Sequence, residues 1–152
     1  MVRGWPGTAE RHRLPLGMAG AERVEAAAAI KVAAFRASLR SFLRQSERVA
    51  RESGLTPQRY MLLLMIKGAP DASERSTVTE LAERLELGQS TVTELAGRAE
   101  DAGLIVREPS ENDGRVAHLA LTDEGEKRLA LAFRTLAVER AALREAILEL
   151  AT

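Results

Sequence analysis

The sequence predicts a mainly α-helical protein that carries one small β-hairpin, and three observations lead to this fold class. Aromatic residues make up 3% of the 152 residues, while alanine, leucine, glutamate and arginine dominate, a composition typical of helices. Apolar residues recur at spacings of three and four on both sides of residues 76–128. Residues 76–128 instead combine two short helical patterns, a tight turn and two strand patterns. Together these elements have the layout of a winged helix-turn-helix flanked by helices.

The composition also limits the class of protein. With 45% hydrophobic residues, a chain of this length can bury the core of about one domain. Cysteine is absent, which excludes disulfides and thiol-based redox sensing. No apolar run approaches the roughly 18 residues needed to span a bilayer, and the first 20 residues lack an apolar stretch of signal-peptide length. The sequence therefore predicts a cytoplasmic protein without membrane contact.

Residues 1–20 contain four glycines, two prolines and no helical period. We predict a disordered tail here, and translation starting at Met1 or at Met18 both remain open. Residues 21–152 are predicted to form one domain. Its winged helix-turn-helix covers about residues 56–121, and dimerisation helices cover about residues 22–53 and 122–151.

A long helix is predicted from about residue 22 to residue 53, because apolar residues form one stripe along it. The stripe contains Ala28, Val32, Phe35, Leu39, Phe42, Ser46 and Val49, with the serine as its one polar member. Gly54 stands where a helix C-cap falls, and Thr56 with Pro57 is typical of a helix start. This second helix is almost wholly apolar over residues 60–66 and is expected to be buried. Residues 67–76 are predicted to form a loop.

Residues 77–103 predict two short helices that meet at a tight turn. Thr77 and Glu80 fit a capping box, in which each side chain binds a backbone N–H at the helix start. The turn is assigned to residues 87–89. Glu86 stands where such turns often carry glycine, so Gly88 is expected to serve instead. We expect the two helices, the second at about residues 90–102 and ended by Gly103, to bury Leu81, Ala82, Leu85, Val92, Leu95 and Ala99.

Residues 104–121 predict the hairpin. The first strand is assigned to residues 104–107, the polar turn to residues 109–114, and the second strand to residues 115–121, with Leu119 and Leu121 facing inward. Thr122, Asp123 and Glu124 then predict a helix start, since acidic side chains favour the positive end of a helix. The helical pattern continues to the end of the chain through Leu129, Phe133, Leu136, Leu143, Ile147 and Leu150.

Four segments resemble the MarR family of bacterial transcription regulators. They are LTPQRYMLLLMI, TVTELAERLELGQSTVTELAGRAEDAGLIVR, the Asp-Gly-Arg of residues 113–115, and LALTDEGE. Their order and spacing agree with the family over about residues 25–150. The resemblance implies a homodimer, formed by the first and the last two helices, that binds a pseudo-palindromic operator in double-stranded DNA. It also implies a sequence-specific transcriptional regulator, a repressor released by a small anionic, aromatic or phenolic ligand, and no cofactor.

Short polar side chains near the N-terminus of the second short helix are the candidate readers of the DNA major groove. Glutamine can pair with adenine, serine and threonine with phosphates or base edges, and glutamate can accept from cytosine N4. The candidate residues are Gln89, Ser90, Thr91, Thr93 and Glu94, with Arg98 one turn further on for a phosphate. Many relatives carry a basic residue near Glu94, so Glu94 either narrows the operator sequence or lies in solvent. The alternative is that this face is only the exposed side of an amphipathic helix.

Arg115 is the candidate wing residue, since a planar cation suits the narrow and strongly negative minor groove of A·T-rich DNA. The family's wing motif is Asp-x-Arg. Asp113 is therefore expected to support the wing by holding the Arg115 guanidinium, because carboxylate and guanidinium pair bidentately. The alternative is an ordinary salt bridge within the hairpin.

Charge is distributed unevenly along the chain. Residues 76–128 contain six basic and twelve acidic residues, a net charge of −6, whereas residues 1–60 contain eleven basic and five acidic residues, a net charge of +6. Because DNA readers carry a basic footprint, we expect modest affinity and few phosphate contacts. Arginines at positions 36, 40, 44 and 48 form a ridge opposite the apolar stripe. This ridge is a solvated face, a surface that faces phosphates, or a clamp for a ligand carboxylate. In the last case Arg44 and Arg48 border, with Tyr60, a ligand cleft of the kind that the resemblance implies.

Other function classes have little support in the sequence. An enzyme needs a nucleophile with a base or paired acids in a pocket, and neither pattern is present. His118 has no partner at metal-ligand spacing, so we expect no metal site. The remaining alternative to a DNA-binding regulator is a winged-helix module that binds another protein through its acidic face.

Overall fold

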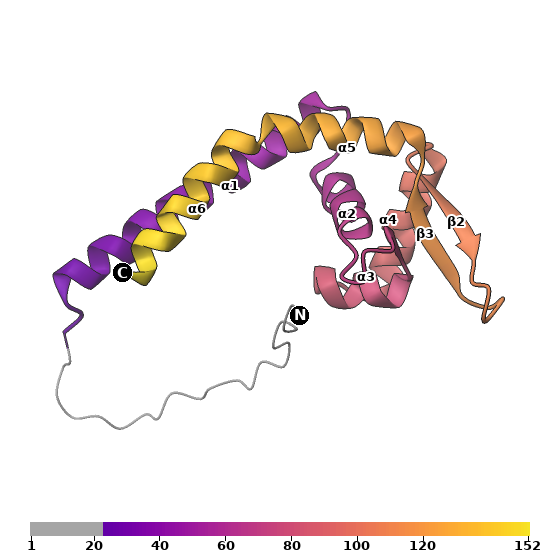
Figure 1. Cartoon of the computed structure of the whole chain (residues 1–152), viewed down its shortest axis with the longest axis horizontal. Helices are drawn as coiled ribbons and strands as arrows, with labels where there is room; N and C mark the ends of the chain where they lie inside the picture. The colour runs from indigo at the N-terminus through magenta and orange to yellow at the C-terminus, as the bar shows by residue number, and fades with distance from the viewer. Residues whose placement is uncertain (1–22) are drawn as a thin grey trace, which may run out of the picture.

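The structure is a computed structural model that describes residues 23–152. The predicted disordered tail and the choice between Met1 and Met18 concern residues 1–22 and lie outside the described residues. In the part that is described, no helix is both long enough and apolar enough to cross a membrane. The molecule has two parts, which Figure 1 shows: an arm formed by residues 26–52 and 137–151, and a lobe formed by residues 57–121.

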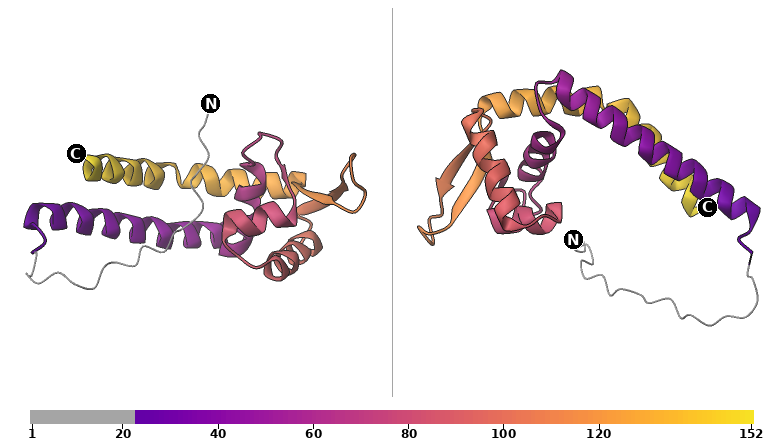
Figure 2. Two further views of the ribbon diagram at one scale, coloured as in Figure 1. Left: turned by 90° about the horizontal axis from the view of Figure 1, so that it is seen from below. Right: turned by 180° about the vertical axis from the view of Figure 1, so that it is seen from behind.

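The arm consists of two helices that run antiparallel. Helix α1 (Ala26–Glu52) is packed along helix α6 (Ala137–Ala151), and helix α5 (Asp123–Thr135) leads from the lobe into α6. Both views in Figure 2 show the arm extending away from the lobe. The long predicted C-terminal helix is thus two helices, with a break at Leu136. Leu136 is fully buried and lies at φ −86° and ψ 8°, which bends the chain there.

The lobe has three helices and a three-stranded sheet. Helix α2 (Pro57–Lys67) is followed by strand β1 (Arg75–Ser76), helices α3 (Val78–Leu85) and α4 (Gln89–Asp101), and strands β2 (Ile105–Pro109) and β3 (Ala117–Leu121). The sheet order is β1-β3-β2, with both pairs antiparallel and Arg107 opposite Leu119. The sequence did not predict β1, because two residues within a predicted loop carry no alternation pattern.

One core holds the lobe together. It is formed from the buried faces of α2, α3 and α4, from the end of α1 and the inner face of α5, and from residues beside and within the sheet. Its largest fully buried side chains include Leu62, Leu63, Ile66, Leu81, Val92, Leu104, Ile105 and Leu119. Of the inward residues predicted for α3 and α4, Leu81, Ala82, Val92 and Ala99 are buried, while Leu85 and Leu95 are partly buried against the core. Ala96, which was not predicted, is fully buried.

The helix starts follow local capping chemistry. Thr77 and Glu80 form the predicted capping box at α3, the Thr56 hydroxyl accepts from Arg59 N at the start of α2, and the Thr122 hydroxyl accepts from Gly125 N at the start of α5. Thr122 Oγ1 also donates to the Gly103 carbonyl at 2.6 Å. This last bond joins the start of α5 to the backbone that follows α4, so it helps to fix how α5 leaves the sheet.

Two local predictions were wrong. Gly88 does not replace a missing glycine between α3 and α4. It is the N-cap of α4 at φ −65°, and Glu86 itself adopts the left-handed conformation at φ 56°. Arg115 is not in a strand, because β3 begins at Ala117 and the turn of the hairpin extends to Val116.

The stripe predicted on α1 is buried only near the lobe. Val49 is buried and Phe35, Leu39, Phe42 and Ser46 are half-buried, whereas Ala28 and Val32 are exposed. The outer half of α1 therefore lacks a complete partner within one chain.

Candidate nucleic-acid interface

Helix α4 presents one face to the core and the opposite face to solvent. Its inner face consists of Val92, Ala96 and Ala99, all fully buried. The small alanines let α4 lie close to its neighbours, and its contacts are with α3, α2 and β2. An outward face backed by a packed core is a rigid platform for recognition.

The structure brings all six predicted residues of α4 to the exposed surface. Gln89, Ser90, Thr91, Thr93, Glu94 and Arg98 are each exposed. The Thr93 hydroxyl donates to the Gln89 carbonyl at 2.8 Å, so its proton is already used inside the helix. Arg98 Nη2 donates to Glu94 Oε1 in an ion pair four residues apart. The face therefore offers hydroxyl, amide and carboxylate groups, with one cation partly neutralised by its neighbour.

A hollow of about 380 Å³ separates the start of α2 from α4. It is lined by Thr56, Gln58, Arg59, Leu87, Thr91, Glu94, Leu95 and Arg98. Arg59 adds a second cation beside Arg98. Arg59 was not predicted as a site residue, because the helix that contains it was expected to be buried. The position of Arg59 in the first turn of α2 could have identified it.

The wing is the hairpin formed by β2, β3 and the turn between them. Arg115 lies exposed in that turn. Asp113 Oδ1 accepts a hydrogen bond from the Arg115 backbone N–H at 3.0 Å, and Val116 N donates to the Asp113 carbonyl at 3.0 Å. Within residues 23–152, the Arg115 guanidinium makes no ion pair with Asp113. The expected side-chain pair is thus corrected, because Asp113 stabilises the backbone of the turn and leaves the guanidinium exposed.

Salt bridges help to fix the β2–β3 hairpin relative to α4. Arg107 on β2 donates to Glu100 on α4 at 2.7 Å, and Arg75 on β1 lies 3.5 Å from Glu108 on β2. Each pair is partly exposed, so each contributes modestly to stability. Their effect is positional, since they join α4, β1 and β2 into one unit that carries both candidate surfaces.

The three candidate ligand residues differ in exposure. Arg44 and Arg48 are exposed on α1, and Arg48 is bound to Gln45 and to Glu52, both at 2.9 Å. Tyr60 is 5% exposed in the core. Burial raises the pKa of its phenol, and the nearby Arg140 opposes that shift. None of the three lines the hollow beside α4 or the cavity between α2 and α5.

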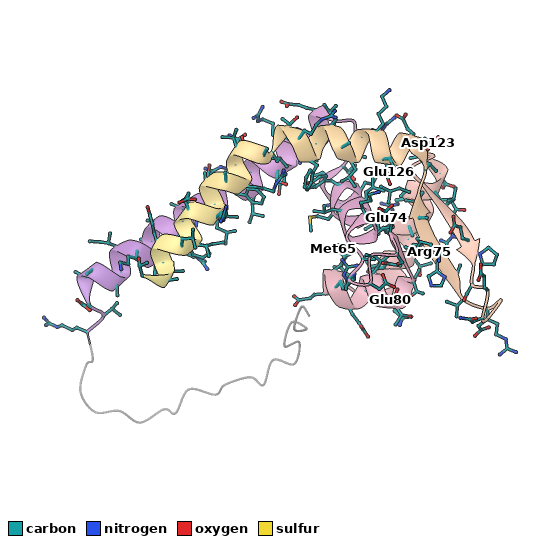
Figure 3. The ribbon with its side chains drawn as sticks, viewed as in Figure 1. Met65, Glu74, Arg75, Glu80, Asp123 and Glu126 are labelled. Atoms are coloured by element: carbon teal, nitrogen blue, oxygen red, sulfur yellow. The ribbon has the colours of Figure 1, made fainter. Side chains whose placement is uncertain are left out.

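That second cavity has a volume of about 360 Å³ and mainly apolar walls. It is lined by Leu64, Lys67, Gly68, Glu126, Leu129, Ala130 and Phe133. Lys67 Nζ donates to Glu74 at 2.7 Å and to Glu126 at 2.8 Å, and these two carboxylates lie close together below α5 in Figure 3. The hydrogen bonds to Glu126 and then Glu74 raise the pKa of Lys67, which keeps the ammonium charged.

Comparison with known proteins finds a family whose model matches the lobe. The model of the MarR family matches residues 53–116, from the end of α1 to the wing. The HTH-type transcriptional repressor MdtR of Bacillus subtilis (strain 168) is 35% identical over 75 residues, which are 49% of this chain and 46% of MdtR. In its lobe, the chain is similar to the MarR family. The match with MdtR spans about half the length of that relative.

Solved structures of MarR family proteins resemble this one beyond the lobe. The YusO protein from Bacillus subtilis is 28% identical, with a TM-score of 0.56 over 78% of this chain and 79% of YusO. A mutant MarR from E. coli complexed with operator DNA has a TM-score of 0.59 over 71% of this chain and 75% of that chain. At 19% identity, the latter comparison shows the fold.

Proposed function

We propose that this protein is a sequence-specific DNA-binding transcriptional regulator, with α4 in the major groove and Arg115 in the minor groove. The observation that carries the proposal is one rigid lobe that exposes a polar face of α4 and a wing arginine whose guanidinium has no ion pair within residues 23–152. The E. coli relative complexed with operator DNA supports this function, as does the repressor MdtR.

The charges of the lobe predict how strongly it binds. Of the six cations in residues 76–128, Arg84, Arg107 and Arg128 bind carbonyls or carboxylates of the protein, and Arg98 pairs with Glu94. Arg115 and Lys127 have no ion pair among the described residues. With Arg59 beside the hollow, few phosphate contacts are available. Affinity should therefore be modest and its dependence on salt shallow.

Titration of a fluorescent duplex from the region upstream of the gene tests the proposal. Arg115→Ala should leave thermal stability almost unchanged, because the side chain is exposed. Operator affinity should fall by about 1–3 kcal/mol, the range for losing a good groove contact. Thr93→Ala should change the order of preference among operator variants, since this position faces base edges. Arg144→Ala, which removes one exposed cation from the arm, is the matched control and should bind as wild type does.

Wild-type binding by both the Arg115→Ala and the Thr93→Ala variants would contradict the proposal. The acidic lobe would then be explained better by the alternative function, a winged-helix module that docks another protein. The net charge of −6 in residues 76–128 is the observation that supports this alternative.

The same proposal includes a homodimer on a pseudo-palindromic operator. The arm and the helix α5 that leads into it expose large apolar side chains: Val24 just before α1, Ile30, Val32 and Leu43 on α1, Leu131 and Phe133 on α5, and Val138, Ile147, Leu148 and Leu150 on α6. An apolar surface of this extent supports contact with a second copy. A dimer presents two copies of α4 to two half-sites of DNA.

A more specific part of the proposal is that a small aromatic acid releases the repressor from DNA. We place the ligand in the cavity between α2 and α5, since its volume suits a small molecule and Lys67 supplies a cation at its edge. A ligand carboxylate would compete with Glu74 and Glu126 for Lys67, which changes how α2 is tied to α5. Salicylate is expected to raise the melting temperature and to weaken operator binding in wild type but not in Lys67→Met. Equal responses of wild type and Lys67→Met would contradict ligand binding in this cavity. No response in either protein would contradict release by an aromatic acid.

A further inference from the structure

Glu94 occupies the centre of the exposed face of α4. Ser90, Glu94 and Gly97 follow one another at spacings of four and three residues, opposite the buried Val92, Ala96 and Ala99. Any helix that enters a groove with its inner face in the protein core must present this row to the bases. In that arrangement the carboxylate of Glu94 faces the bases.

The two neighbours of Glu94 in this row are small. Gly97 is not required by packing, because a Cβ built there would meet nothing within 4 Å. Ser90 is short and exposed. Short residues on either side allow the backbone of α4 to approach the DNA closely, which makes Glu94 the side chain that reaches furthest.

Glu94 forms an ion pair with Arg98, one turn further along α4. Arg98 Nη2 donates to Glu94 Oε1, while both side chains stay about two-thirds exposed, at 66% and 64%. Glu94 Oε2 accepts no hydrogen bond from within residues 23–152. One oxygen thus has a partner within the protein, and the other is left for a donor outside it.

Base chemistry limits what that donor can be. An ionised carboxylate only accepts hydrogen bonds. In the major groove guanine presents two acceptors and thymine one, adenine has its N7 acceptor beside the N6 donor, and cytosine presents the N4 donor alone. A carboxylate is repelled by guanine and thymine and meets an unfavourable acceptor at adenine. We infer that Glu94 is a specificity-determining residue that selects cytosine at one position of each operator half-site.

This inference rests on the proposed function and names the base that the site reads. Selection from a random pool of DNA duplexes with the full-length chain tests it, using wild type and Glu94→Gln in parallel. Glutamine pairs well with adenine N6 and N7, so the preferred base at one position should change from cytosine to adenine. Replacing that cytosine pair should weaken wild-type binding about tenfold and Glu94→Gln binding hardly at all. Glu145→Gln, an exposed change of equal charge on α6, is the matched control and should select the wild-type sequence.

The possible outcomes distinguish a failure of this inference from a failure of the proposed function. If wild type enriches one sequence and Glu94→Gln changes a cytosine position to adenine, both stand. If both proteins enrich the same sequence, or if the changed position is not cytosine in the wild-type sequence, Glu94 does not select cytosine, although the chain still reads DNA. If wild type enriches no sequence, the proposed function fails as well.

Discussion

Glu86 adopts a left-handed backbone conformation, at φ 56° and ψ 39°, at the turn that orients α4 relative to α3. A residue with a Cβ is strained there by roughly 1–2 kcal/mol, because the Cβ approaches the following carbonyl oxygen. The strain persists because both sides of the turn are fixed. Leu87 N donates to the Ala82 carbonyl at 3.0 Å, and Val92 N donates to the Gly88 carbonyl at 3.1 Å.

Glu86→Gly should therefore stabilise the protein by about 1 kcal/mol, since glycine adopts this conformation without the Cβ contact. Thermal or urea unfolding measures the change. Glu83→Gly is the matched control, because Glu83 is an exposed glutamate within the regular part of α3. The control should destabilise the protein by about 1 kcal/mol. If the two variants are destabilised equally, the turn is not strained at Glu86.

Two arginines join secondary-structure elements across the lobe. Arg84 on α3 donates to the Met65 carbonyl at 2.6 Å and to the Gly68 carbonyl at 2.9 Å, at the end of α2. Arg128 on α5 donates to the Gly54 carbonyl at 2.8 Å, between α1 and α2, and to Glu124 at 2.7 Å. Backbone carbonyls at helix ends lack partners inside their helix, so these bonds stabilise the ends as well as the packing.

Helix α5 begins against the backbone that follows α4, and this contact leaves room only for glycine. A Cβ at Gly125 would lie 2.1 Å from the Leu104 carbonyl oxygen, which itself accepts from Thr122 N. Gly125→Ala should destabilise the protein by about 3 kcal/mol, since rigid backbone must move to admit one methyl group. Calorimetry of Gly125→Ala beside Gly97→Ala checks this prediction. Gly97 has free space and lies within a helix, so alanine there should stabilise by about 1 kcal/mol.

Helix starts were predicted well, because capping depends on residues three positions apart. The Thr77–Glu80 box and the caps at Thr56 and Thr122 are confirmed. Strand β1 and the conformation of Glu86 were not predicted, since both depend on residues distant in sequence. Ser76 pairs with Leu119, and Glu86 is held by the packing of α3 against α4.

The candidate site was predictable where it depends on helical periodicity. Periodicity correctly placed the six candidate residues of α4 on an exposed face, although their contact with DNA stays a prediction. The side-chain pair of Asp113 with Arg115 was wrong, because a short turn offers Asp113 a nearer backbone donor. Arg44, Arg48 and Tyr60 were grouped from a resemblance alone, and the burial of Tyr60 separates it from the exposed arginines.

At the scale of the whole molecule, the lobe is complete within one chain and the arm is not. Helix α6 has no buried residue, although it packs along α1 over most of its length. Val138 is 77% exposed and Ile30 is 69% exposed. Two antiparallel helices bury only one stripe each, and in the proposed dimer a second copy covers the rest.

We therefore expect light scattering to give twice the mass of one chain. Ile147→Glu combined with Leu148→Glu places two charges in the apolar surface of α6, where each residue is 49% exposed in the single chain. The double variant should be monomeric and bind the operator more weakly, because two linked half-site contacts become one. Val106→Glu, a similar change on the lobe, should remain dimeric.

Deleting residues 136–152 is the more severe form of this experiment. The truncation removes the buried Leu136 and all of α6, which leaves the half-buried Phe35, Leu39 and Phe42 of α1 without part of their cover. Large apolar side chains then face water in both protomers, so the truncated chain should aggregate or unfold on heating at lower temperature. A soluble, folded monomer that binds the operator as tightly as the full chain would show that the arm is dispensable. The dimer would then have to be abandoned together with the two-half-site operator.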